Sequence, residues 1–212
     1  MRPAGGLPQD DHRPADDMTP QPDHDRETDG VRALVRPLRP GSAARRARAV
    51  VRETLRRAGL DDGDIADAEL VVAELAANAE KHARPPYELR IFSLDGVPTW
   101  CEVVDGDPDF HEVRIIFALL RSVAEIGLPL LAENGRGLLL VHRLSRGHCH
   151  VCPTTVFTTG APGKAVTFAL PTRSGSRPTF PPLPDLRPGL ARLRRWSACD
   201  PPAERRDRGM EG

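Results

Sequence analysis

The sequence is poor in lysine, in net charge and in long apolar runs, and the last two shortages each exclude a class of protein. Among its 212 residues only Lys81 and Lys164 are lysines, and thirty basic residues are balanced by thirty acidic ones. A general nucleic-acid-binding protein usually has a marked basic excess, so we expect no direct nucleic-acid binding. No apolar run approaches the roughly 18 residues that a membrane-spanning helix needs, so we expect no membrane segment.

Cysteine is also scarce, with four residues in the whole chain. The first residues, MRPAGGLPQDD, lack the apolar stretch of a secretory signal peptide. Proteins that stay inside the cell normally keep their cysteines reduced. The sequence therefore predicts a soluble, cytoplasmic protein with free thiols at Cys101, Cys149, Cys152 and Cys199.

Composition divides the chain into a core and two polar tails. Residues 1–30 carry eight acidic residues against three arginines and almost no large apolar groups, so we expect this acidic segment to be disordered. Residues 172–212 are rich in Pro, Ser and Arg, and we expect a mostly disordered tail. A spacing of Leu186, Leu190, Leu193 and Trp196 could form one or two helical turns there. Residues 31–171 have the size of a single domain.

The core alternates helical patterns with strand patterns. Helices are expected at 42–58, from 61 to before Pro85, at 111–127 and at 135–145; strands are expected at 31–37, in YELRIFSLDG (87–96), in TWCEVVDGD (99–107), around 150–158 and at 165–171. Ser42 is expected to cap the first helix and Gly59 to end it. Because the strands are mostly linked as hairpins, the pattern predicts an α/β (α+β) two-layer sandwich whose mixed, mostly antiparallel sheet carries helices on one face.

The segment VVAELAANAEKHA (71–83) places three polar residues on a largely apolar helix. Glu74, Asn78 and His82 are four positions apart, and at about 100° per residue they follow the edge of the apolar stripe. Polar groups left unpaired at such an edge are costly, so these side chains usually contact something. They either bond to backbone and water at a helix boundary or line a site, and the helix alone does not decide between the two.

Two segments downstream contain groups suited to a nucleotide. In VVDGDP (103–108), Asp105 can accept a hydrogen bond from an exocyclic amine, and Gly106 lets a flat base approach the backbone. In ENGRGLLLV (133–141), Gly-Arg-Gly precedes a helix whose free N–H groups favour a phosphate. Asn78 could then complete a magnesium shell. A carboxylate one turn earlier could accept the proton of an attacking hydroxyl.

In this order and spacing, the segments resemble the histidine-kinase-like ATPase family, which has the Bergerat (GHKL) ATP-binding fold. ELAANAEKHA resembles the N box of that family, VVDGDP and GRGLLLVHRLS resemble its two glycine boxes, and GKAVTFALP resembles its closing strand. The most similar branch is that of the small bacterial anti-sigma factors that act as serine/threonine protein kinases. The resemblance covers roughly residues 31–171 and neither tail.

The resemblance implies ATP and Mg²⁺ as cofactors. Glu74 would be the general base, Asn78 the magnesium ligand, and Asp105 would bind the adenine amino group. The other nucleotide-binding residues that it implies are His82, Gly106, Gly135, Arg136, Gly137 and Leu138. The implied function is an anti-sigma factor whose kinase activity phosphorylates an anti-anti-sigma (STAS-type) partner and so releases a sigma factor. The alternative is a non-catalytic ATP-binding or partner-binding module of the same fold.

The sequence departs from the family pattern at two places near the expected base. Residues 105–109 read DGDPD, whereas the first glycine box commonly reads DxGxG. Ala165 stands where a threonine close to the adenine is frequent, so a hydroxyl that helps to hold the base is missing. Both departures predict weakened nucleotide binding.

Two further segments have alternative interpretations. The helix expected at 111–127 is apolar on almost every side, which indicates packing against the core or against a second protein, including a possible homodimer. RGHCHVC (146–152) contains zinc-ligand types, but no second ligand pair follows at a distance, and in a strand Cys149 would face away from His148, His150 and Cys152. We therefore prefer an incidental placement to a metal site. No G-x-S-x-G motif supports a covalent nucleophile.

Overall fold

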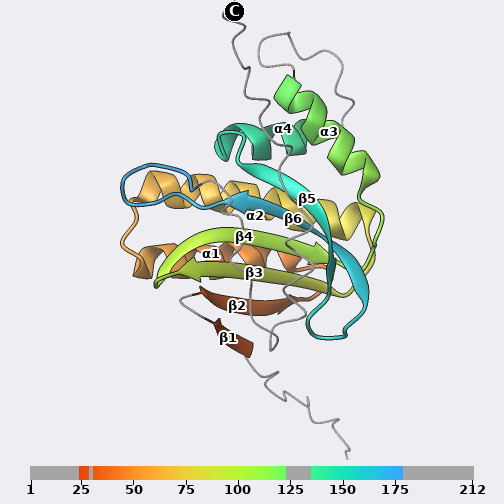
Figure 1. The fold of residues 1–212 in the computed structure, drawn as a ribbon, viewed down its shortest axis with the longest axis horizontal. Helices are drawn as coiled ribbons and strands as arrows, with labels where there is room; N and C mark the ends of the chain where they lie inside the picture. The colour runs from red at the N-terminus through yellow and green to blue at the C-terminus, as the bar shows by residue number, and fades with distance from the viewer. Residues whose placement is uncertain (1–23, 29–30, 123–134, 179–212) are drawn as a thin grey trace, which may run out of the picture.

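The computed structural model describes residues 24–28, 31–122 and 135–178 of the chain (Figure 1). They form a six-stranded sheet in the order β1-β2-β3-β4-β6-β5, together with four helices. The strands are β1 (His24–Thr28), β2 (Val31–Leu38), β3 (Tyr87–Leu94), β4 (Val97–Asp105), β5 (Cys149–Thr155) and β6 (Pro162–Ala169); the helices are α1 (Ala43–Arg57), α2 (Asp62–His82), α3 (His111–Ser122) and α4 (Gly135–Leu144). Residues 123–134, at the end of the expected third helix, and 179–212, with the expected tail helix, lie outside the described residues.

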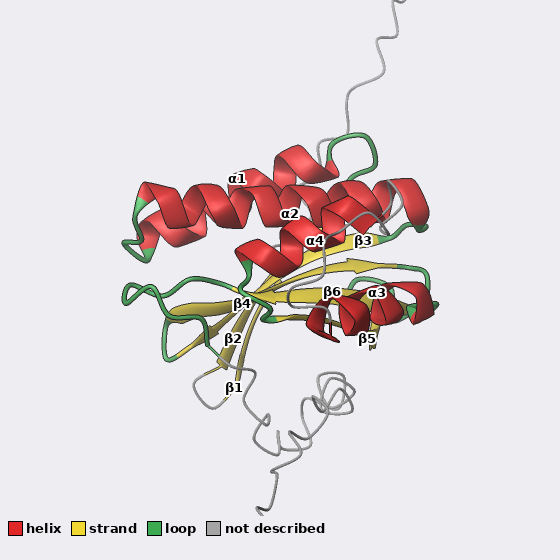
Figure 2. Ribbon diagram, turned by 90° about the horizontal axis from the view of Figure 1, so that it is seen from above, coloured by secondary structure: helices red, strands yellow, loops and turns green. Residues whose placement is uncertain are grey.

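The expected two-layer α+β sandwich is confirmed. All five strand pairings are antiparallel, so the described sheet is more uniform than the mixed one that the hairpin pattern predicted. Figures 1 and 2 show α1 and α2 side by side across one face of the sheet, with α4 next to α2 and α3 next to β5. None of the described helices is long and apolar enough to cross a membrane.

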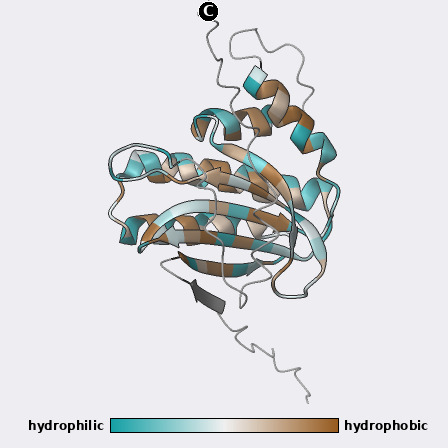
Figure 3. Cartoon of the chain, viewed as in Figure 1, coloured by the Kyte–Doolittle hydropathy of each residue, from teal (hydrophilic) through white to brown (hydrophobic). Residues whose placement is uncertain are grey.

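The main core lies between this helix layer and the sheet. Ala47, Val51 and Leu55 of α1 are fully buried, as are Val72 and Ala76 of α2. Figure 3 shows apolar and polar residues interspersed along the strands and along the helices behind them. The hydrophobic spacing that predicted both helices therefore also identifies the surface that each one buries.

The helix ends show which side chains form the caps and how the predictions for Ser42 and Gly59 stand. Asp61 caps α2, because its side chain accepts a hydrogen bond from the Asp64 N–H at 2.9 Å. Gly59 follows α1 with a φ of 72°, a conformation that glycine adopts without strain. The prediction for Ser42 was wrong in its mechanism, since its side chain makes no capping hydrogen bond. Instead, the carboxylate of Glu80 from α2 accepts from the Ala43 N–H at 3.4 Å.

Both tails contain described residues that composition did not predict to be ordered. His24–Thr28 form β1, which pairs with β2 and corrects the expectation of disorder for that part of residues 1–30. The backbone of an edge strand has unpaired N–H and C=O groups, and a polar segment can bond to them without burying apolar side chains. Residues 172–178 form a hydrogen-bonded turn in which Thr172, Ser174 and Ser176 bond to one another.

Helix α3 is amphipathic rather than apolar on every side. Phe117 and Leu120 are 1% and 8% exposed and belong to the main core, which favours the burial of this helix in its own domain. Ile115 and Leu119 are about half exposed, at 48% and 51%. The sequence alone does not distinguish the buried apolar side chains of α3 from the exposed ones, because tertiary packing determines which of them are buried.

Candidate functional site

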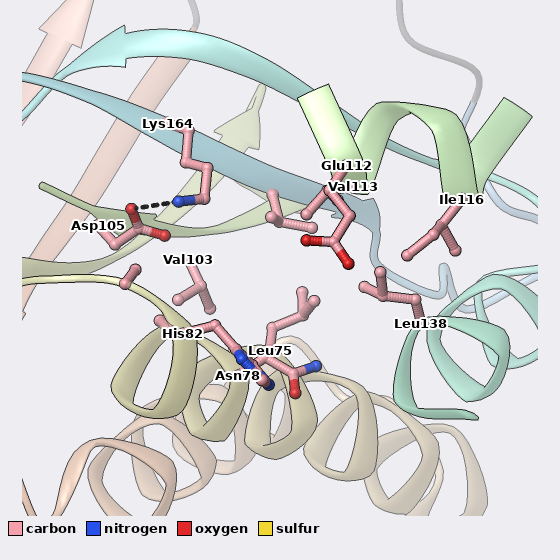
Figure 4. A pocket seen from close by; sticks show the side chains of 13 residues that line it. Leu75, Asn78, His82, Val103, Asp105, Glu112, Val113, Ile116, Leu138 and Lys164 are labelled. Carbon is pink, nitrogen blue, oxygen red and sulfur yellow. Dashed lines mark hydrogen bonds and ion pairs between the residues drawn. The ribbon is translucent and has the colours of Figure 1, made fainter. Parts of the chain in front are cut away.

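A cavity of about 110 Å³ lies between α2 and strands β4 and β6, and α3 and α4 close its side (Figure 4). This volume is several times the space that one water molecule requires. Its walls are mostly apolar, with a few polar side chains, as in sites for flat organic ligands. The lining residues are Leu75, Asn78, Ala79, His82, Ala83, Val103, Asp105, Glu112, Val113, Ile116, Leu138, Lys164 and Val166.

Four of the predicted site residues meet at this cavity. Asn78 and His82 come from successive turns of α2, Asp105 from the last position of β4, and Leu138 from the first turns of α4. Figure 4 shows the Asn78 amide on the α2 side and the Asp105 carboxylate on the sheet side. Two of the three polar residues at the edge of the α2 stripe, Asn78 and His82, therefore line a cavity and are not confined to a helix boundary.

Asp105 is paired with a lysine that the sequence analysis did not identify. Residues 105 and 164 are opposite each other in the β4–β6 register, and the Lys164 Nζ lies 2.9 Å from Asp105 Oδ1. Asp105 is 3% exposed and Lys164 is 7% exposed. Burial raises the pKa of Asp105 above its ordinary value, although the hydrogen bond and positive charge of Lys164 act in the opposite direction.

Ala165 does not occupy the position at the cavity that the family pattern indicated. It belongs to a small buried cluster with Val104, Cys152 and Val156, whereas its neighbours Lys164 and Val166 line the cavity. Alternate residues of a strand face opposite sides of the sheet, so Ala165 points away from the site. The β6 residue that lines the cavity opposite Asp105 is therefore Lys164, and the β4–β6 register was needed to identify it.

Gly106 also has a different role from the one expected. It does not line the cavity, and a Cβ at this position would lie 2.6 Å from the Pro85 carbonyl oxygen. The Gly106 N–H donates to the Arg84 carbonyl at 2.9 Å, and the Arg84 side chain donates to the Gly106 carbonyl at 3.1 Å. The glycine thus permits the close approach of β4 to the α2–β3 connection.

The DGDPD segment has its own local order despite its departure from DxGxG. The Asp105, Asp107 and Asp109 carboxylates each accept a hydrogen bond from the N–H two residues ahead, at 3.0, 3.1 and 3.0 Å. The last of these N–H groups belongs to His111, the first residue of α3. Successive Asx turns therefore lead from the cavity into α3 without the missing glycines.

The segment predicted to bind phosphate, which begins at Gly135, and the predicted general base, Glu74, lie next to each other beside the cavity. A Cβ at Gly137 would overlap the Glu74 carboxylate, so this side chain packs against the first turn of α4. Neither residue lines the cavity, and Arg136 is exposed. Gly135 is the first residue of α4, so the helix begins at the Gly-Arg-Gly sequence as expected.

The histidine and cysteine residues of 148–152 are divided between two faces of the sheet. Cys149 belongs to the main core and Cys152 to the cluster on the opposite face. Burial raises the pKa of Cys149 to about 11 and lowers that of His150 to about 4. Within the described ranges, no group of three or more His, Cys, Asp or Glu side chains could hold a metal ion.

Comparison with known families agrees with this geometry. The family model of the histidine kinase-like ATPase domain matches residues 37–168, which is more than half of the chain. The chain belongs to the histidine kinase-like ATPase family. No curated protein gives a significant match. The matched range of this ATPase domain contains every element that lines the cavity, and membership identifies the chain as an ATP-binding domain.

The cavity of this histidine kinase-like ATPase domain has the kinds of wall and polar group that a purine would require. Leu75, Val103 and Val166 provide apolar walls for a flat ring, and the Asp105 carboxylate provides an acceptor at one end. The Asn78 amide is a suitable oxygen ligand for Mg²⁺, which normally takes one or two protein oxygens and completes its shell with phosphates and water. Glu112 of α3, another residue that the sequence analysis did not identify, extends its carboxylate into the same space (Figure 4).

Proposed function

We propose that this chain is an ATP- and Mg²⁺-dependent serine/threonine kinase that regulates a sigma factor by phosphorylating an anti-anti-sigma (STAS-type) protein. The observation that carries the proposal is the convergence of Asn78, His82 and Asp105 on one cavity. Helix α4 begins next to this cavity, and Glu74 lies against its first turn. Groups that can contact the adenine base, the metal ion and the phosphates thus lie along one side of α2.

Each side chain has a defined task in this proposal. Asp105 accepts a hydrogen bond from the adenine amine, and Asn78 holds the magnesium ion. His82 contacts the nucleotide, and the segment Gly135–Leu138 surrounds the phosphates with the N-terminal N–H groups of α4. When bound, ATP would supply the phosphoryl group and Mg²⁺ would neutralise charge on it. Glu74 accepts the proton of the partner's hydroxyl group.

The second candidate function is an ATP-binding or partner-binding module without phosphoryl transfer. It is favoured by the position of Glu74, which packs against Gly137 outside the cavity lining. In this case nucleotide would stabilise the fold or the partner-binding surface, and Glu74 would support α4.

Transfer of labelled phosphate separates the two functions. The protein is incubated with γ-labelled ATP, Mg²⁺ and STAS-type proteins of the same cell, and labelled partner is measured. The kinase proposal predicts transfer that Glu74→Gln reduces by roughly a hundredfold or more, because general-base catalysis typically contributes that much. Glu53→Gln, at an exposed ion pair on α1, is the matched control and should transfer normally.

Asn78→Ala should lose both magnesium-dependent nucleotide binding and transfer. Nucleotide binding by the parent protein without any transfer would favour the non-catalytic module. The proposal also assigns the protein to the cytoplasm, with a sigma factor as its second partner and a possible homodimer as its assembly. Co-purification of the protein with a sigma factor, measured before and after incubation with ATP, Mg²⁺ and the STAS-type protein, tests the partner assignment. Failure of the two proteins to co-purify under either condition would contradict it.

A further inference from the structure

Lys164 has no task in the proposed function, although it lies in the cavity beside the proposed base-binding carboxylate. It is one of two lysines in the chain and is 7% exposed. A buried ion pair is weak evidence for a role in stability, because apolar replacements of such pairs are often neutral or stabilising. The position of the pair at the cavity indicates a role in ligand binding instead.

The hydrogen bonds of the pair leave one carboxylate oxygen for a ligand. Lys164 Nζ and the Asp107 N–H both donate to Asp105 Oδ1, at 2.9 and 3.0 Å. Among the described residues no hydrogen bond ends on Oδ2, and Figure 4 shows this second oxygen directed toward the cavity. The carboxylate can therefore accept a further hydrogen bond while it keeps the lysine.

Lys164 can likewise contribute a donor without leaving Asp105. Its ammonium group has three N–H donors, and its remaining contacts are with the Asp107 carbonyl at 3.4 Å and the Asp107 Oδ2 at 3.3 Å. Both distances are longer than the usual range for a charge-assisted hydrogen bond. Exchange of one such contact for a ligand atom costs little, whereas separation of the ion pair would leave a buried charge unpaired.

An acceptor and a donor side by side match the Watson–Crick edge of adenine. On that edge the exocyclic amine is a donor, and the adjacent ring nitrogen N1 is an acceptor. We propose that Asp105 and Lys164 bind this edge together, with Asp105 Oδ2 accepting from the amine and Lys164 Nζ donating to N1. The assignment rests on the proposed ATP site and adds Lys164 as a base-binding residue that determines specificity.

A nucleotide analogue tests the lysine contact without altering the protein. Calorimetry compares the binding of ATP and of 1-deaza-ATP, in which a C–H group replaces N1, to the full-length chain in the presence of Mg²⁺. A hydrogen bond to a charged group corresponds to a loss of about tenfold to a hundredfold in affinity. We expect 1-deaza-ATP to bind more weakly by that factor.

Variants of the two lysines complete the test. Lys164→Met should lose a similar factor for ATP and should no longer distinguish ATP from 1-deaza-ATP, which is an effect that a purely structural role would not produce. Lys81→Met removes the other lysine, which is exposed, and should retain the parent's affinity and discrimination. Circular dichroism checks that each variant is folded.

Three results would overturn the assignment. Equal binding of ATP and 1-deaza-ATP by the parent protein would remove the contact with N1 and leave the proposed function intact. Tighter ATP binding by Lys164→Met or Lys164→Thr would show that the lysine blocks Asp105. A parent protein that binds neither nucleotide would refute the proposed ATP site and this assignment with it.

Discussion

Replacement of Arg90 by methionine tests how the sheet holds the strand that carries Lys164. Arg90 lies on β3 with 1% of its surface exposed. Its guanidinium donates to Glu88 Oε2 at 2.8 Å and to the Thr155 carbonyl at 2.7 Å, and it lies 3.6 Å from the centroid of the Phe157 ring. Glu88 in turn accepts from the N–H groups of residues 157 and 158, at 3.0 and 2.8 Å. This network attaches the β5–β6 hairpin to β3.

The expected cost of Arg90→Met follows from the carboxylates that would be left behind. Glu88 and Glu102 are 0% and 1% exposed, and Arg90 lies 3.5 Å from Glu102 in addition to its bonds with Glu88. Removal of one partner of a buried pair typically costs about 3–5 kcal/mol, and loss of the cation–π contact adds about 1 kcal/mol. Because domains have a stability of about 5–15 kcal/mol, the variant should lose a large part of its free energy of unfolding.

The loss should depend on pH in a defined direction. Burial raises the pKa of Glu102 in spite of Arg90, whereas for Glu88 the effect of burial is outweighed by Arg90 and the Thr158 N–H, so its pKa is lowered. Without Arg90 both pKa values should rise. A carboxyl group whose pKa is raised by folding stabilises the fold at low pH and loses this contribution as the pH rises through the folded value. The destabilisation should therefore be largest at neutral pH and smaller in acid.

Urea unfolding, followed by circular dichroism at neutral and mildly acidic pH, measures both effects. Arg57→Met is the matched control, because Arg57 forms an exposed ion pair with Glu53 and such pairs contribute about 0–1 kcal/mol. A loss for Arg90→Met no larger than that of Arg57→Met, or a loss independent of pH, would refute the reasoning.

Three other predictions concern the site and the buried thiols. Gly137→Ala should displace the Glu74 carboxylate and lower phosphate transfer, and the double variant with Glu74→Ala should regain stability in urea unfolding but not transfer. Nucleotide affinity should fall on acidification at a higher pH than an ordinary aspartate would require, because burial raises the pKa of Asp105; calorimetry across a pH series measures this, and a flat profile would contradict it. Cys149, with its pKa raised by burial to about 11, should resist iodoacetamide in the folded protein and react after unfolding, as mass spectrometry can show.

Local chemistry made much of the helix layer predictable. Asp61 and the prolines at 85–86 bound α2 as expected, and the Asp95-Gly96 turn has positive φ at both positions, 48° and 81°. These signals depend on neighbouring residues alone, so a single sequence contains them. The pairing of β1 with β2 depends on backbone groups distant in sequence, and composition gave no indication of it.

The site was predictable only in part for a related reason. Asn78, His82 and Asp105 were found because they lie in motifs with characteristic spacing. Lys164 lies in no such motif, and its position opposite Asp105 follows from the β4–β6 register. A shift of one residue in that register would place Lys164 on the other face of the sheet, so a count along the sequence cannot establish the pair.

The short segment after β6 affects where this domain can be trimmed. The Arg173 side chain donates to the carbonyl of Ala58, the C-cap of α1, at 2.8 Å, and the Arg177 side chain donates to the carbonyl of Leu144, the last residue of α4, at 2.9 Å. Two guanidinium groups thus occupy two helix carboxyl ends, where positive charge is favourable. A protein shortened to the family match, which stops at residue 168, would lose both of them. The folded unit therefore extends at least to residue 177.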